Sequence, residues 1–294
     1  MRAVLLCGAV LGLCVPSMAR ANEVVLEPSS KWQLDYGEDK CRLGRTFGEG
    51  EQKTVLFLEQ YEPSEFFGWT IAGSPVGQLG QGREPRVQFG TLPPSRHERD
   101  QAGVFSGELD QFGPALIGSG YKDEPRVDDE DEAAKPGLPQ LNLEDGSRIE
   151  WIEFARGESR RLRVNTGNMR SAFAALNACT ANLVTHWGLD VEEQRRRANA
   201  PKWLNTARVV RQIGETYPDK ALRKGEQARL HVRMMVSAEG EATKCVVTKM
   251  TVAESFNDQA CKVIMRNARF DPARTPDGKP VASYMATSII YVIS

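Results

Sequence analysis

Apolar and polar residues alternate most clearly in the last quarter of the chain. Every second residue from Leu230 to Val236 is apolar, and His231 and Arg233 lie between them. A period of two predicts a β-strand with one buried face. A turn at Gly240, which is free to take positive φ, then leads into a second predicted strand from Ala242 to Met250.

A helix and a third strand complete this region. Apolar residues at helical spacing predict a helix from Phe256 to Ala268, with Ser255 as its candidate N-cap. A turn at Asp277-Gly278 precedes a run rich in β-branched and aromatic residues, which predicts a last strand from Val281 to Ile293. Upstream, Tyr217-Pro218 marks an extended segment that turns into a short helix. The predicted order is strand, strand, helix, strand.

This order and its motifs resemble the C-terminal domain of the TonB energy-transducer family. The resemblance covers about a quarter of the chain, and its most specific residues are Tyr217-Pro218, Gly240, Arg269-Phe270, Pro272 and Gly278-Lys279-Pro280. It implies a periplasmic, non-catalytic module that binds a short segment of an outer-membrane transporter or forms a dimer.

The open edge of the predicted sheet is the candidate binding site. An edge strand presents unpaired N–H and C=O groups, which accept an extended peptide or a second copy of the chain by strand addition. By position, the final strand forms this edge, with Tyr217 and Pro218 beside it. The candidate partner-binding residues on the strand are Tyr284, Thr287, Ile289 and Tyr291.

The first 21 residues have the pattern of a signal peptide. Arg2 is followed by an apolar run from Ala3 to Val15 and by the small-x-small sequence Ala19-Arg20-Ala21, so we expect cleavage before Asn22. The run is shorter than the ~20 residues of a spanning helix. We therefore expect a periplasmic mature protein without a spanning helix. If the segment is instead retained as an anchor, the chain is a membrane-anchored energy transducer for outer-membrane transport.

The remainder of the chain predicts an α+β protein of two domains. Residues 22–188 contain short β-forming runs and read as a mostly-β domain of unknown role, closed by one amphipathic helix from Met169 to Trp187. Residues 189–206 form a charged linker with a short exposed helix, and residues 207–294 form the TonB-like domain. The strongest β-forming runs are Trp32–Tyr36, Thr54–Tyr61, Phe66–Ile71, Val87–Phe89, Ile149–Phe154 and Ser159–Val164.

Four cysteines remain after signal cleavage, in a compartment that permits disulfides. Cys245 lies on a predicted strand and Cys261 on the helix expected to cover it, so we predict that they pair. Cys41 is then left to pair with Cys179 and to close the first domain. Spacing of the C-x-x-C type is absent, so no structural metal is expected.

Charge and motifs narrow the classes of function. The mature chain has 36 basic and 39 acidic residues, a net charge of -3, which gives no electrostatic reason to expect nucleic acid. The acidic stretch at 123–132 lacks the spacing of a calcium loop and reads as a solvated loop. We find no catalytic constellation or cofactor motif and expect no enzyme activity and no cofactor. The alternative is an envelope enzyme with a carboxylate site in the N-terminal β-domain.

Overall fold

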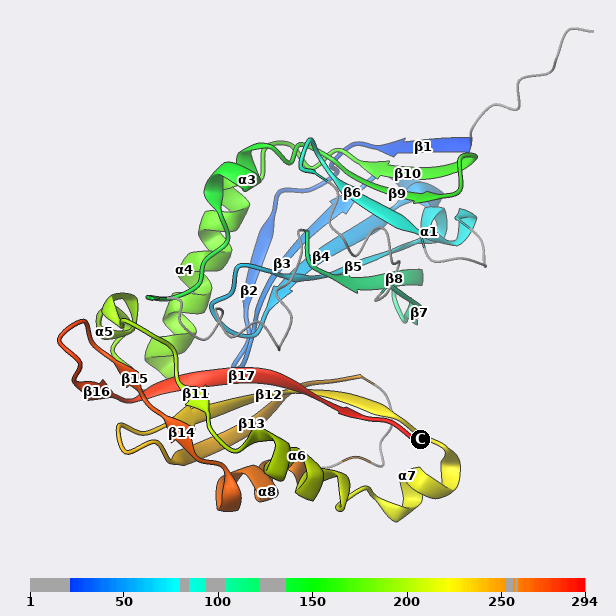
Figure 1. Ribbon diagram of the computed structural model, residues 1–294. Helices are drawn as coiled ribbons and strands as arrows, with labels where there is room; N and C mark the ends of the chain where they lie inside the picture. Colours follow the sequence, from blue (N-terminus) through cyan, green and yellow to red (C-terminus); the bar gives the residue numbers. More distant parts are fainter. Residues whose placement is uncertain are drawn as a thin grey trace, which may run out of the picture.

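The computed structural model describes residues 22–79, 85–93, 104–121, 136–251, 256 and 259–293. The expected signal peptide and the candidate helix cap Ser255 lie outside the described residues. Helices and strands combine in an α+β arrangement, as predicted. In Figure 1 the elements from β1 to α4 lie above those from β11 to β17, and we call these two parts the N-terminal and C-terminal domains.

Two sheets form the N-terminal domain. One is a six-stranded antiparallel sheet with the order β2-β3-β4-β5-β8-β7, and the other has the order β1-β10-β9-β6, in which β1 and β10 are parallel. The first contains β2 (Gln33–Tyr36), β3 (Cys41–Phe47), β4 (Thr54–Gln60), β5 (Gly68–Gly73), β7 (Phe105–Leu109) and β8 (Gly113–Ser119). The second contains β1 (Asn22–Leu26), β6 (Arg86–Phe89), β9 (Ile152–Arg156) and β10 (Arg160–Val164).

One long helix, α4 (Arg170–His186), lies against these sheets, where the amphipathic pattern predicts it. It buries Phe173, Leu176 and Cys179, whose spacing of three residues places them on one face. The Phe173 ring lies 5.6 Å from the ring of Phe67, so the helix shares the core of the domain. The short helices are η1 (Gly50–Gln52), α1 (Ser74–Gln78) and α3 (Leu143–Ser147).

The C-terminal domain is a three-stranded antiparallel sheet with the order β13-β12-β17, so β12 is central. Its strands are β12 (Ala228–Val236), β13 (Ala242–Thr251) and β17 (Ser283–Tyr291), close to the predicted ranges. Its helices are α6 (Thr206–Gly214), α7 (Asp219–Lys224) and α8 (Gln259–Asn267). Two small ladders pair β11 (Lys202–Trp203) with β14 (Phe270–Asp271) and β15 (Ala273–Arg274) with β16 (Pro280–Val281).

Both faces of the three-stranded sheet are covered. Helices α6 and α8 lie on one face, and the N-terminal domain lies on the other (Figure 1). Leu230 and Val232 point into the core beneath the helices, whereas Met235 and Tyr284 pack against Val184 of α4. The sheet is therefore a layer between the two hydrophobic cores.

The connection between the domains differs from the exposed linker that the sequence predicts. A short helix, α5 (Val191–Arg196), is present, but Gln194 is fully buried and donates a hydrogen bond to the carbonyl oxygen of Ala282. Arg197 is also buried, and Trp203 joins the core of the C-terminal domain. Gln194 and Arg197 are exceptions in this polar segment, because they donate to Ala282 and Ser283 rather than to water, whereas Arg195 and Arg196 are exposed.

The structure contains both disulfides that the sequence predicts. Cys41 on β3 is bonded to Cys179 on α4, and Cys245 on β13 is bonded to Cys261 on α8. Each bond joins a strand to the helix that covers its sheet. The first closes a loop across most of the N-terminal domain, with a sequence separation of 138 residues.

Gly240 occupies a turn that no other residue fits without displacement. Its φ is 81°, and an added Cβ would lie 2.1 Å from the carbonyl oxygen of Phe270. The Phe270 N–H donates to the Gly240 carbonyl at 2.9 Å, which holds the β12–β13 turn against β14. Two of the motifs that carry the family resemblance are thus in direct contact.

We expect Gly240→Ala to lower the free energy of unfolding by about 3 kcal/mol, because it combines left-handed backbone strain with a collision against backbone. Gly225→Ala is the matched control. Gly225 has a φ of 66° with nothing within 4 Å of an added Cβ, so about 1 kcal/mol of strain is expected alone. Chemical denaturation of both variants measures the difference. Equal losses would contradict the role of the Phe270 contact.

Candidate functional site

Strand β17 is an edge of the C-terminal sheet, as predicted. It pairs with β12 along its whole length, from Ser283 opposite Val236 to Tyr291 opposite Ala228. No described strand pairs with its other side. In an antiparallel pair, N–H and C=O groups alternate between the partner strand and the opposite side. About half of the backbone polar groups of β17 therefore point away from β12.

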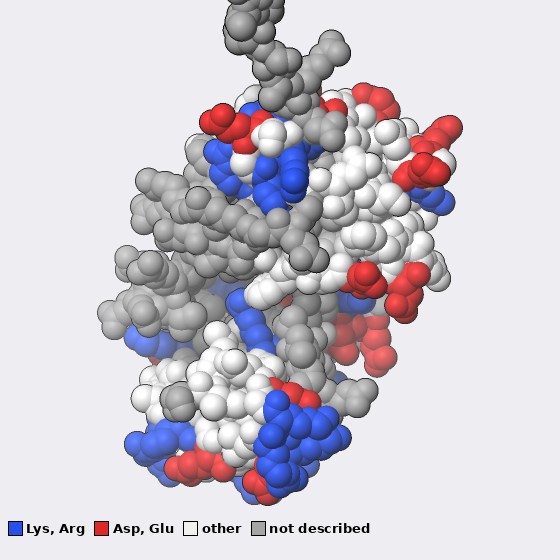
Figure 2. Space-filling view, turned by 90° about the vertical axis from the view of Figure 1, so that its right-hand side faces the viewer, with Lys and Arg blue, Asp and Glu red and all other residues white. Residues whose placement is uncertain are grey.

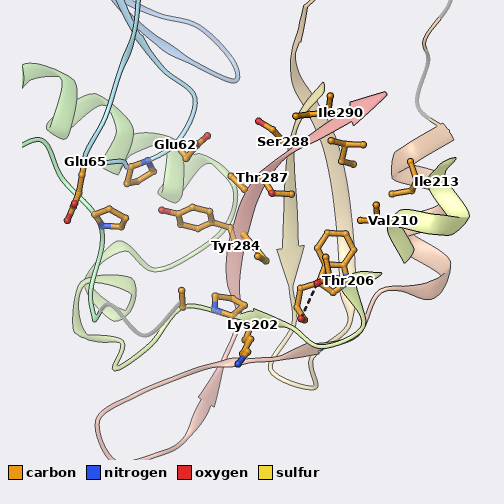
Figure 3. Close-up of a pocket in the computed structure, with 18 of the residues that line it drawn as sticks. Glu62, Glu65, Lys202, Thr206, Val210, Ile213, Tyr284, Thr287, Ser288 and Ile290 are labelled. Carbon is orange, nitrogen blue, oxygen red and sulfur yellow. Dashed lines mark hydrogen bonds between the residues drawn. The ribbon is translucent and has the colours of Figure 1, made fainter. Parts of the chain in front are cut away.

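A groove of about 910 Å³ follows this open side of β17 (Figure 3). All residues from Tyr284 to Val292 line it. One wall comes from the C-terminal domain and includes Trp203, Val210 and Ile213. The other wall comes from the N-terminal domain and the segment before α4, and includes Glu62, Pro63, Glu65 and residues 136–140. The groove therefore has an unpaired strand at its base and walls from both domains.

Helix α6 forms the apolar wall. Val209 and Ile213, four residues apart, are buried against the sheet, which leaves Val210 on the groove side with 48% of its surface exposed. Asn205 fixes the start of the helix, since its side chain donates to the Asn267 carbonyl and accepts from the Arg269 N–H. Helix α6 was not predicted from the sequence, although the four-residue spacing of Val209 and Ile213 is a helical signal.

The part of the chain that contains the open edge strand matches a known family. Residues 214–293 match the family model of the Gram-negative bacterial TonB protein C-terminal domain. This match confirms the resemblance predicted from the sequence, and it spans the three-stranded sheet, α7 and α8. No curated protein matches the chain significantly. The TonB-like domain is an interaction module by family, whereas the N-terminal domain and most of α6 lie outside the match.

Three of the predicted partner-binding side chains are buried by the protein itself. Ile289 and Tyr291 lie in the core of the TonB-like domain, where Tyr217 packs edge-to-face on Tyr291 with ring centroids 5.3 Å apart. Tyr284 packs on Trp187 of the N-terminal domain at 5.1 Å. These side chains support the strand, and any pairing with a partner must use its backbone.

The remaining predicted residues divide between the groove and its surroundings. Thr287 is half-buried and lines the groove, as does Tyr217, whose hydroxyl donates to the Glu226 carbonyl at 2.5 Å. Pro218 is the N-cap residue of α7 and is not part of the groove lining. Burial raises the pKa of Tyr217, Tyr284 and Tyr291 above the usual value, so all three phenols are neutral at physiological pH.

One ion pair and one histidine–carboxylate contact join the N-terminal domain to the TonB-like domain. Arg233 of β12 is 2% exposed, donates to Asp39 Oδ1 at 2.8 Å, and lies 4.0 Å from the ring centroid of Trp187. The Nε2 of His231 lies 3.0 Å from both carboxylate oxygens of Glu62. These contacts hold Glu62 beside the groove. We call the five residues Asp39, Glu62, Trp187, His231 and Arg233 the seam.

Among the described residues, neither a metal site nor a membrane-spanning helix offers a second candidate function. No group of three or more His, Cys, Asp or Glu residues in the described part of the chain could hold a metal ion. None of the described helices has the length and apolarity required to cross a membrane. On the face in Figure 2, basic side chains gather at the lower end near α7, with acidic side chains beside them.

We expect Asp39→Ala to lower the free energy of unfolding by about 2 kcal/mol, because it leaves the buried Arg233 guanidinium without its carboxylate. Asp35→Ala is the control, since Asp35 is exposed on neighbouring β2, and a change within about 0.5 kcal/mol is expected. Thermal unfolding followed by calorimetry measures both variants. Identical curves for the two variants would show that the seam does not depend on this ion pair.

Proposed function

We propose that this protein binds an extended segment of an outer-membrane transporter by strand addition along β17. The main observation in support of this proposal is the groove beside β17, a strand that pairs with another described strand on one side only. An added strand would complete the unpaired N–H and C=O groups of β17 and place alternate side chains on the two walls. The TonB-like match supports a transporter as the class of partner.

We place the protein in the periplasm and consider it non-catalytic. The two disulfides fit an oxidising compartment of the cell envelope, and the sequence pattern of residues 1–21 is that of a cleaved signal peptide. In this proposal, the N-terminal domain acts as part of the binding surface, because it supplies one wall of the groove.

A segment of another protein fits the groove better than a second copy of the sheet edge. The walls rise on both sides of β17, with Val210 on one side and Pro63 on the other. A single extended chain can enter between the walls, whereas a second complete domain would meet both of them. A second copy of this chain is therefore the less favoured occupant of the groove.

Photo-crosslinking in the envelope tests the proposal. With Val210 replaced by p-benzoylphenylalanine, we expect a crosslinked product that contains an outer-membrane transporter, because this side chain faces the groove. Leu222 is the matched control position, since it is also 48% exposed but lies on α7 and does not line the groove. Mass spectrometry identifies the crosslinked protein and peptide.

The same experiment can contradict the proposal. The product should disappear when Ser288, on the floor of the groove, is replaced by Trp to fill the space. Equal crosslinking from positions 210 and 222, or a product made only of two copies of this chain, would rule out transporter capture in the groove.

A further inference from the structure

We propose that the outer face of helices α6, α7 and α8 docks on the surface of an anionic phospholipid membrane. We call the exposed side of Thr206–Gly214, Asp219–Lys224 and Gln259–Asn267 the helix layer. This face is distinct from the groove along β17, so the inference goes beyond the proposed function and does not depend on it.

The helix layer has a large excess of positive charge. Its three helices contain seven basic residues and one acidic residue, a net charge of +6, in a chain whose net charge is -1. The rest of the chain therefore carries a net charge of -7. All seven basic side chains are exposed. The charge of the protein is thus divided unequally, with the helix layer as a positive surface on an otherwise acidic chain.

The helical period points these cations away from the sheet. Two residues along an α-helix turn the side chain by about 200°. Arg211 is two residues from the buried Ile213 of α6, and Lys262 and Arg266 are each two residues from the buried Ile264 of α8. The cations therefore lie on the side opposite the N-terminal domain (Figure 1). Figure 2 shows basic side chains gathered at this lower end of the molecule.

Neighbouring cations within the helix layer repel one another. Lys220 and Lys224 are four residues apart on α7, and Lys262 and Arg266 are four residues apart on α8. Like charges at this spacing destabilise a helix. Lys224 has a carboxylate partner in Glu226, at 3.3 Å, which offsets one of these charges. An anionic surface outside the protein would relieve the rest of the repulsion.

The helix dipole accounts for only part of the excess. It favours a cation in the last turn of a helix, where Arg211 and Arg266 lie. Arg208 and Lys220 lie instead in the first turns of α6 and α7, where the dipole disfavours a cation. Asp219 is the one acidic residue of the three helices. The stability of the helices alone therefore does not explain the charge of the layer.

Exposed apolar side chains among the cations favour a lipid surface over a soluble anion. Leu222 is 48% exposed and is followed by Arg223 and Lys224, and Met265 is 37% exposed and precedes Arg266. In helices that lie on a membrane, apolar side chains enter the boundary of the acyl chains while cations contact lipid phosphates. An anionic phospholipid surface satisfies both kinds of side chain.

The docked orientation would place the groove beside the membrane. Val210 and Arg211 are consecutive residues of α6, so their side chains point about 100° apart. Val210 lines the groove, whereas Arg211 belongs to the helix layer. One helix would therefore contact the membrane with one side and border the open edge strand with another. The N-terminal domain would lie on the far side of the sheet (Figure 1).

Sedimentation with lipid vesicles tests the docking on the mature chain. One set of vesicles contains phosphatidylcholine alone, and the other contains equal amounts of phosphatidylcholine and phosphatidylglycerol. At low ionic strength we expect at least about tenfold tighter binding to the anionic vesicles, because each basic side chain near such a surface adds to the attraction. Salt at about 0.5 M should remove this preference, since it shortens the Debye length to about 4 Å.

Paired substitutions locate the binding surface. Arg211→Gln combined with Arg266→Gln should weaken binding to the anionic vesicles about 20-fold, because two outward-pointing cations are lost. Lys31→Gln combined with Lys53→Gln is the matched control, since both lysines are exposed in the N-terminal domain and the change in net charge is the same. The control should alter the affinity by less than about twofold. Thermal unfolding verifies that both variants are folded.

Several outcomes would overturn the proposal. Equal binding of the wild-type chain to the two kinds of vesicle would exclude recognition of anionic lipid. Equal losses in the two double variants would show that net charge, and not the helix layer, drives binding. Absence of binding to both kinds of vesicle would assign the positive charge to a protein or a soluble polyanion instead. None of these results bears on the crosslinking from position 210, which tests strand addition separately.

Discussion

The packing of one face of the β12–β17 sheet against the N-terminal domain is the contact on which the groove depends. The apolar part of this contact consists of Met235 and Tyr284 against Val184 and Trp187. Because Tyr284 belongs to β17, the same contact positions the edge strand relative to the second wall. Without it, the strand would remain an edge, but it would have helix α6 on one side and solvent on the other.

Much of the C-terminal fold could be predicted from the sequence because its signals are local. The alternation from Leu230 to Val236 and the apolar spacing of the α8 region each depend on residues close in the chain, and both elements are present. The disulfide between Cys245 and Cys261 followed from the same local order. The strands β3 and β8 were missed, since β3 contains one glycine and several polar residues and β8 contains two glycines and a proline, so neither is a strong β-forming run.

The seam could not be predicted for a physical reason. His231 and Arg233 alternate with apolar residues, and this pattern normally indicates a strand face in water. In the structure that face is covered, and both residues are paired with carboxylates more than 160 positions earlier in the chain. Such pairing depends on how two domains dock, which a single sequence does not encode in any local period. The same reason accounts for the burial of Gln194 and Arg197 within a segment that the sequence predicts to be exposed.

The shared construction of the groove has a thermodynamic consequence. A ligand that touches walls from both domains binds the docked arrangement and not the separated one, so its binding free energy adds to the free energy of docking. By linkage, a change that favours docking raises the apparent ligand affinity by the factor by which it raises the docked fraction of the chain. Ligand binding at the edge strand and docking of the two domains are therefore thermodynamically coupled. A change in one can be detected by measuring the other.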